Sequence, residues 1–207
     1  MRGLFFTFEG IDGCGKSTQL KEIASRLESR GVPVLTTREP GGTPVAEKIR
    51  EILISPENSE MVNECELFLY LAARAQHVRE KIIPALQKGM IVLCDRFLEA
   101  TFAYQGFGRG LSLSFLEQLN SFATGGLIPD RTFIFDVPVE ISGQRMDQMN
   151  KKKDRLEQNG PEFYEKIRKG YLFMAEKQSG SCVLIDGCQE VSRISDQVWE
   201  EIEKLLD

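Results

Sequence analysis

One short stretch combines glycines, a lysine and a serine in a pattern that can hold phosphate groups. It matches G-x-x-x-x-G-K-[ST] without a gap. The glycines let successive backbone N–H groups turn inward around an anion. Lys16 would reach the β- and γ-phosphates of a nucleoside triphosphate, and the Ser17 hydroxyl would bind Mg²⁺. The stretch predicts an ATP site made by Gly10, Ile11, Asp12, Gly13, Cys14, Gly15, Lys16, Ser17 and Thr18.

A second chemical element lies about eighty residues further along the chain. Ile91–Asp95 is an apolar run that ends in a carboxylate. Such a strand places its terminal Asp beside the magnesium that accompanies ATP. We therefore expect Ser17 and Asp95 to hold Mg²⁺ together.

Three arginines fall near the expected ligand-facing ends of the strands. Arg38 follows one apolar run, Arg96 follows Asp95, and Arg74 lies on a helix between them. A phosphorylated acceptor carries about two negative charges, so a kinase acting on it needs arginines to gather both anions. The pattern favours a kinase whose acceptor is a nucleotide monophosphate.

Other proteins with such a loop remain as alternatives. A guanine-specific switch usually carries N-K-x-D, and the nearest run here, Asn150–Asp154, is one residue too long. An ATPase that produces only a conformational change has no use for Arg38. A kinase for another pyrimidine monophosphate, or for an unphosphorylated deoxynucleoside, is the closest alternative, and the acceptor arginines argue against the second of these.

The elements that must position these residues alternate along the chain. The predicted strands are Leu4–Glu9, Val32–Thr37, Met90–Asp95, Arg131–Val137 and Cys182–Asp186. The predicted helices are Lys16–Arg30, one that begins at Thr43-Pro44, Glu64–Gln87, Ser112–Ala123, one from Val139 towards Asn150, Glu162–Lys177 and Val191–Leu206. This alternation predicts an α/β fold of three layers in one domain, residues 1–207, with a parallel five-stranded sheet and helices on both faces. Ligands then bind at the carboxyl ends of the strands.

A basic segment interrupts an otherwise acidic chain. Asn150–Arg155 is polar and basic, while the net charge of the protein is −5. We interpret residues of about 147–159 as a short lid that closes over phosphates. Its phosphate-binding cation would be one of four residues, and the sequence does not decide among Lys151, Lys152, Lys153 and Arg155.

The composition restricts location and partners. An acidic chain lacks the broad basic field that nucleic-acid binding needs. The five cysteines form no metal-spaced pair and indicate a reduced, cytoplasmic protein. No run approaches the roughly 18–20 apolar residues that cross a membrane, and no signal peptide is expected.

Several motifs together resemble thymidylate kinase. They appear in that family's order and cover about three quarters of the chain. Thr37–Thr43, read T-R-E-P-G-G-T, is close to diagnostic of the family. The other matching motifs are Glu9–Ser17, Ala72–Arg74, Asp95-Arg96, Ala103–Gly106 with Gly108–Gly110, and Asp154–Glu157.

The resemblance implies substrates and residue roles. It implies ATP with Mg²⁺ and dTMP as ligands, dTDP as product in dTTP synthesis, and a homodimer. Arg38 and Arg96 would hold the dTMP phosphate, Arg74 the thymine edge, and Tyr70 the base face. The implied dTMP site comprises Arg38, Glu39, Tyr70, Arg74, Arg96, Thr101, Tyr104 and Gln105. The implied catalytic set is Asp12, Lys16, Arg96, Arg155 and Glu157.

The sequence departs from the family pattern at a few positions. Gly13 stands where some relatives carry an arginine in the phosphate loop, so the sequence resembles the version whose lid supplies the cation. Asn150 falls roughly where that lid arginine is expected. Ala100 replaces a serine, and Thr101 is expected to take over its hydrogen bond.

Overall fold

The computed structural model describes residues 2–148 and 154–206. Its sheet has five parallel strands in the order β2-β3-β1-β4-β5. The strands are β1 (Phe5–Glu9), β2 (Val34–Arg38), β3 (Ile91–Asp95), β4 (Arg131–Asp136) and β5 (Cys182–Asp186). The predicted fold class is therefore confirmed.

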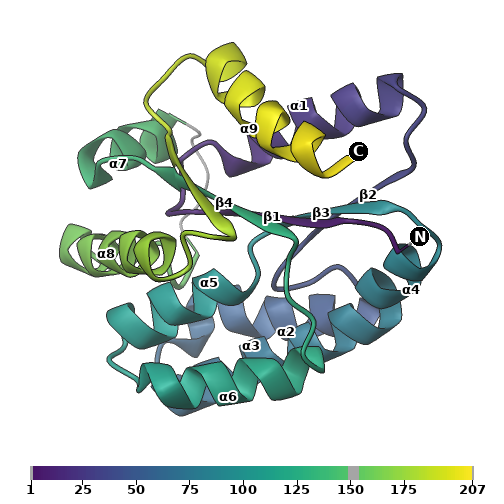
Figure 1. Cartoon of the computed structure of the whole chain (residues 1–207). Coiled ribbons are helices and arrows are strands. Elements are labelled where there is room, and N and C mark those ends of the chain that lie inside the picture. Colours follow the sequence, from purple (N-terminus) through teal and green to yellow (C-terminus); the bar gives the residue numbers. More distant parts are fainter. Residues whose placement is uncertain (1, 149–153, 207) are drawn as a thin grey trace.

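Helices cover both faces of the sheet and make three layers (Figure 1). On one face lie α1 (Lys16–Ser29) and α9 (Val191–Leu206). The other face is covered by α3 (Asn63–His77), α5 (Leu98–Thr101), α6 (Leu113–Thr124) and α8 (Pro161–Lys177), and α2 (Pro44–Ile54) packs beside α3. None of these helices, nor any other in the described part of the chain, is long and apolar enough to span a bilayer.

The central strand β1 is buried on both sides. Phe6 and Phe8 belong to one apolar cluster and Phe5 to another, and all three are fully buried. A central strand of a parallel sheet reads as a continuous apolar run for this reason. The register pairs Asp95 with Phe8 on one side and with Arg38 on the other. The carboxyl ends of β1, β2 and β3 thereby meet at one edge.

The predicted helix Glu64–Gln87 is interrupted. Three helical pieces follow one another there: α3, the π-helical turn η2 (Val78–Ile82) and α4 (Ile83–Gln87). Pro84 lies in the first turn of α4. Proline has no N–H to donate to the preceding turn, which accounts for the local change of hydrogen-bond pattern.

A helical segment that the sequence analysis does not predict follows β3. It comprises α5 and the π-helical η3 (Phe102–Gly108). Phe102, Tyr104 and Gln105 are all buried. Because residues on every side of this segment are buried, it has no polar face and no amphipathic period to detect. The remaining helices are α7 (Val139–Gln148) and the short 3-10 helix η1 (Pro56–Asn58) that follows α2.

Candidate active site

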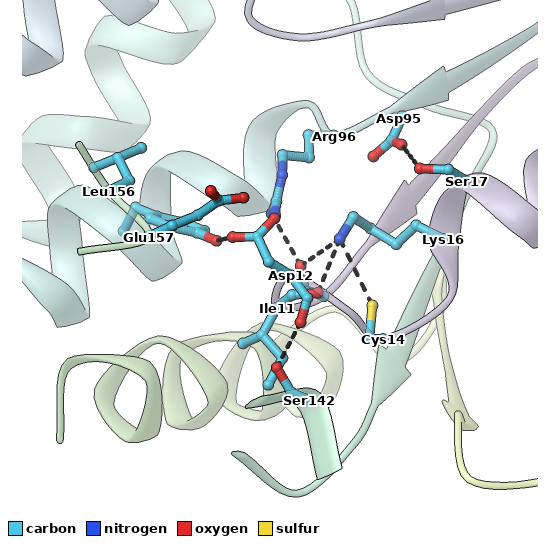
Figure 2. A network of polar contacts seen from close by, with 12 residues as sticks. Ile11, Asp12, Cys14, Lys16, Ser17, Asp95, Arg96, Ser142, Leu156 and Glu157 are labelled. Carbon is cyan, nitrogen blue, oxygen red and sulfur yellow. Dashed lines mark hydrogen bonds and ion pairs between the residues drawn. The ribbon is translucent and has the colours of Figure 1, made fainter. Parts of the chain in front are cut away.

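The glycine-rich loop joins β1 to α1 and turns tightly. Gly10, Gly13 and Gly15 have φ of 135°, 75° and 100°, in the left-handed region that favours glycine. The Lys16 ammonium lies inside this turn and donates to the Gly10 and Ile11 carbonyls at 3.1 and 2.9 Å (Figure 2). The first N–H groups of α1 face the same space and have no partner within the helix. The loop therefore gathers the donors that a polyphosphate needs.

Two oxygen ligands meet beside the loop. The Ser17 hydroxyl donates to the Asp95 carboxylate at 2.6 Å, so the two side chains are in direct contact (Figure 2). Magnesium prefers oxygen ligands and usually takes one or two carboxylates together with substrate phosphates. In the described part of the chain no group of three His, Cys, Asp or Glu side chains could hold a metal. This pair therefore fits a magnesium ion that is bound together with ATP.

Arg96 and Asp12 form the polar centre of the site. The guanidinium donates to Asp12 Oδ1 at 2.6 Å, to the Gly10 carbonyl at 2.9 Å and to the Tyr171 hydroxyl at 2.8 Å. Arg96 has φ of 70°, which is rare for a residue with a side chain. Such backbone strain is concentrated at functional sites. The turn after β3 thus aims Arg96 at the glycine-rich loop.

Asp12 is kept ionised by its neighbours. Burial opposes the charged form, but Arg96 and Lys16 outweigh it and lower the pKa of Asp12 to about 2. The Tyr104 hydroxyl also donates to Asp12, at 3.0 Å. Asp12 is therefore an acceptor near neutral pH and not a proton donor.

A cavity opens next to this centre. It is lined by residues from the glycine-rich loop, from α2, α3, α5 and η3, and by Asp154 and Leu156. Eight of the predicted site residues line it: Asp12, Glu39, Tyr70, Arg74, Arg96, Thr101, Tyr104 and Gln105. Because Asp12 belongs both to the glycine-rich loop and to the cavity wall, the two sites are contiguous.

Arg74 organises the floor of this cavity. Its side chain is 2% exposed and donates to Glu39, Thr101, Asn120 and the Phe97 carbonyl at 2.5–2.7 Å. Burial opposes ionisation of Glu39, but Arg74 and His77 outweigh it and lower the pKa of that carboxyl. The ion pair therefore holds two charges in the interior with their hydrogen bonds made.

The chain is similar to proteins of one family throughout its length. A family model described as "Thymidylate kinase" matches residues 8–198. The chain belongs to the thymidylate kinase family. A relative named thymidylate kinase from Pelotomaculum thermopropionicum is 45% identical over 207 residues, which cover 100% of this chain and 96% of the relative. One from Geotalea daltonii is 49% identical over 191 residues and 89% of each chain.

A solved structure agrees with these sequence matches. The crystal structure of thymidylate kinase from Ehrlichia chaffeensis superimposes with a TM-score of 0.80 at 34% identity, over 98% of this chain and 100% of that one. The predicted family is confirmed.

Gly13, the departure in the phosphate loop, has no room for a side chain. A Cβ there would lie 2.8 Å from the Ser142 carbonyl and 3.2 Å from Met146 Cγ, both on α7. The Ser142 hydroxyl also donates to the Asp12 carbonyl at 2.6 Å (Figure 2). Helix α7 therefore packs directly on the loop, where a side chain at position 13 would stand.

Arg38 does not line the cavity. It lies in β2, is half exposed and donates to both carboxylate oxygens of Glu47 at 2.9 and 3.0 Å. Arg38 lines a different groove, together with Ser17 and Asp95. The structure instead brings Arg50 to the cavity, where its guanidinium donates to the Pro40 carbonyl at 3.0 Å.

The lid residues are divided by their placement. Lys151, Lys152 and Lys153 lie outside the described residues, as does Asn150. Arg155 is 8% exposed, forms an ion pair with Glu66 at 2.8 Å and donates to the Leu53 carbonyl. The Glu157 carboxylate accepts from the Asp154 N–H at 2.8 Å. Arg155 thus ties the C-terminal part of the predicted lid to α2 and α3.

Sequence reasoning missed three residues of the site. Besides Arg50, these are Tyr171, which contacts Arg96, and Arg145, which donates to the Gly13 and Gly187 carbonyls at 3.4 and 3.2 Å. All three lie within helices, where an arginine or tyrosine is ordinarily a surface or core residue. No local pattern of the sequence distinguishes them from other helical residues.

Proposed function

We propose that the protein transfers the γ-phosphoryl group of ATP to dTMP, giving dTDP and ADP as a step of dTTP synthesis. The activity predicted from the sequence is confirmed at the level of the family. The observation that carries the proposal is the contiguity of the two sites: Asp12 and Arg96 line the acceptor cavity and touch the loop that holds Lys16. Donor and acceptor phosphates can therefore meet at the Arg96 guanidinium.

On the donor side, residues Gly10–Thr18 bind the triphosphate. Lys16 leaves the loop carbonyls to contact the β- and γ-phosphates, because ionised oxygens are stronger acceptors than carbonyls. Ser17 and Asp95 hold Mg²⁺, which neutralises charge on the phosphates when it is bound. Arg145 lies beside Gly13 and Gly187 and is placed to contact the nucleotide from α7.

On the acceptor side, the cavity orients dTMP. Arg96 holds the phosphate, and Arg50 joins it from α2. Arg74 and Gln105 contact the thymine edge and Tyr70 its face, while Thr101 and Glu39 fix Arg74. Tyr104 is buried against Asp12 and crowds the ribose 2′ position, which favours deoxynucleotides.

The reaction needs no strong general base. A dTMP phosphate oxygen is already anionic near pH 7, since the second pKa of a phosphate ester is about 6. It attacks the γ-phosphorus in line, and ADP leaves. Lys16 and Arg96 stabilise the charge on the transferring group, so positioning and charge neutralisation supply most of the rate.

The lid completes the site over the phosphates. Arg155 is committed to Glu66, so we assign the phosphate-binding cation to the lysine run Lys151–Lys153. Glu157, whose carboxylate accepts from the Asp154 N–H, is assigned the approach to the acceptor from the lid side.

Assembly and location remain predictions. Phe68 of α3 and Phe115 and Phe122 of α6 are 57%, 49% and 84% exposed. These two helices pack side by side, so their exposed apolar residues are placed to form the predicted homodimer interface. Sedimentation of the purified protein tests this. The predicted cytoplasmic location is tested by fractionating cells.

A coupled assay of ADP release tests the proposed reaction. We expect turnover with dTMP, less with dUMP, and little with dCMP, UMP or thymidine. Equal ADP release without any acceptor would mean that the protein is an ATPase. Turnover with thymidine but not dTMP would mean that the acceptor is an unphosphorylated nucleoside.

A further inference from the structure

A second cavity lies next to the acceptor cavity. Arg74, which lines the acceptor cavity, donates to Asn120, which lines the second one. The second cavity has a volume of about 540 Å³, which is the size of a small-molecule site. Its walls come from α5, η3, α6, the segment before β4 and the turn before β5. None of its described lining residues belongs to the donor loop or to the described part of the predicted lid.

Two buried polar atoms at this cavity lack partners. Glu99 and Asn120 line it and are 2% and 3% exposed. Within the described part of the chain, Glu99 Oε2 and Asn120 Nδ2 have no hydrogen-bond partner. Buried polar atoms are paired in most native structures, because leaving them unpaired is costly. Both atoms therefore indicate a polar group that enters from the cavity.

The identity of the unpaired groups follows from their neighbours. Arg74 can only donate, and it donates to Asn120 Oδ1 at 2.5 Å, so the Asn120 amide N–H₂ is the group left over. Burial, reinforced by Glu9, raises the pKa of Glu99 to about 8. The carboxyl is therefore protonated near pH 7 and offers an O–H donor beside a C=O acceptor.

The rest of the lining excludes anions. Among the described residues no lysine or arginine lines the cavity, and Glu117 at its rim pairs with Lys177 at 3.8 Å. A phosphate inside the cavity would therefore meet no cationic side chain of the lining. The apolar part of the wall is made by Leu98, Phe102, Ile128 and Pro129, which suits a flat ring.

We propose that this cavity binds a small uncharged heterocycle with a lactam edge, an N–H beside a C=O. The lactam N–H pairs with the Glu99 carbonyl oxygen, and its C=O accepts from the Glu99 hydroxyl and from Asn120 Nδ2. Because Asn120 and Thr101 both accept from Arg74, which lines the acceptor cavity, occupancy of the second cavity alters the binding of dTMP.

The first test uses 2-pyridone, the simplest flat lactam. Ligand-observed NMR on the full chain, with and without saturating dTMP, should show binding with a dissociation constant of about 1 mM, ordinary for so small a ligand. N-methyl-2-pyridone lacks the donor and should bind at least about tenfold more weakly. Equal affinity of the two, no binding of 2-pyridone, or its displacement by dTMP would each overturn the proposal.

The second test blocks the cavity. Gly180 lines the rim, is exposed and has open space around its Cβ position, so Gly180→Phe should fold and fill the mouth. Ser121→Phe does the same from α6, and Gly180→Ala is the matched control. We expect both Phe variants to lose 2-pyridone binding at least about tenfold and to abolish a twofold or larger effect of 2-pyridone on the KM for dTMP. Unchanged binding in both Phe variants would place the ligand elsewhere.

Discussion

The donor loop and the acceptor cavity are built in opposite ways. The loop takes its chemistry from consecutive residues, Gly10–Thr18, and its shape from three glycines with positive φ. The cavity draws on residues from Asp12 to Leu156, brought together by five or more separate elements. The donors of the loop are therefore fixed by local backbone geometry, although α7 and Arg96 pack against it. The cavity is a product of packing, and its residues carry stability as well as binding.

Arg74→Met should show the largest effect on the cavity side. It removes a buried charge with four partners, so Glu39 keeps its contact with His77 but loses the guanidinium, and Asn120 Oδ1 loses its donor. We expect the free energy of unfolding to fall by about 3–5 kcal/mol, as measured by urea denaturation. The KM for dTMP should rise while that for ATP changes little. A variant of full stability would mean that the cavity floor does not depend on this ion pair.

Lys16→Ala and Arg96→Ala test the phosphate side of the comparison. Each should lower kcat at least about a hundredfold, because each removes a cation that faces the transferring group. Lys16→Ala should retain the stability of the parent protein within about 1 kcal/mol. Turnover and urea unfolding are measured on the same preparations. Near-normal turnover in either variant would refute the role given to that residue.

Asp12 lies where the glycine-rich loop meets the acceptor cavity, and the pH dependence of stability tests its charge. Its folded pKa of about 2 is below the unfolded value near 3.9. The ionised form thus stabilises the folded protein by about 2 kcal/mol above pH 5, and this contribution is lost as the pH falls towards 2. Asp12→Asn should be less stable than the parent at pH 6, and the gap should shrink by about half at pH 3. A gap independent of pH would show that the carboxylate charge is not the cause.

The smallest expected effect is on the KM for dTMP, and it differs between Arg50 and Arg38. Arg50 lines the acceptor cavity, whereas Arg38 is paired with Glu47 outside it. Arg50→Ala should raise the KM for dTMP about tenfold, and Arg38→Ala less than about threefold, because an exposed pair contributes little. Steady-state kinetics at saturating ATP decide between them. The reverse order would mean that Arg38 leaves Glu47 to bind the acceptor, as the family resemblance implies.

Sequence was sufficient for the fold class and the donor loop. The phosphate loop is a backbone structure, and its glycines, Lys16 and Ser17 follow one another, so their spacing alone predicts the geometry. Alternating apolar runs and amphipathic helices likewise predict a parallel sheet, because burial imposes these periods. Asp95 and Arg96 could be placed at its edge because β3 ends there.

Tertiary packing decided what surrounds the acceptor. That Arg50 lines the cavity while Arg38 does not depends on how α2 packs against α3, and no local pattern encodes it. Arg155 differs from the lysines of the predicted lid because it pairs with Glu66, and this contact forms only in the folded protein. The mostly buried helical segment from Leu98 to Gly108, which carries Thr101, Tyr104 and Glu99 into two cavities, has no amphipathic period. Such contacts join residues far apart in the chain, so they exist only in the folded protein.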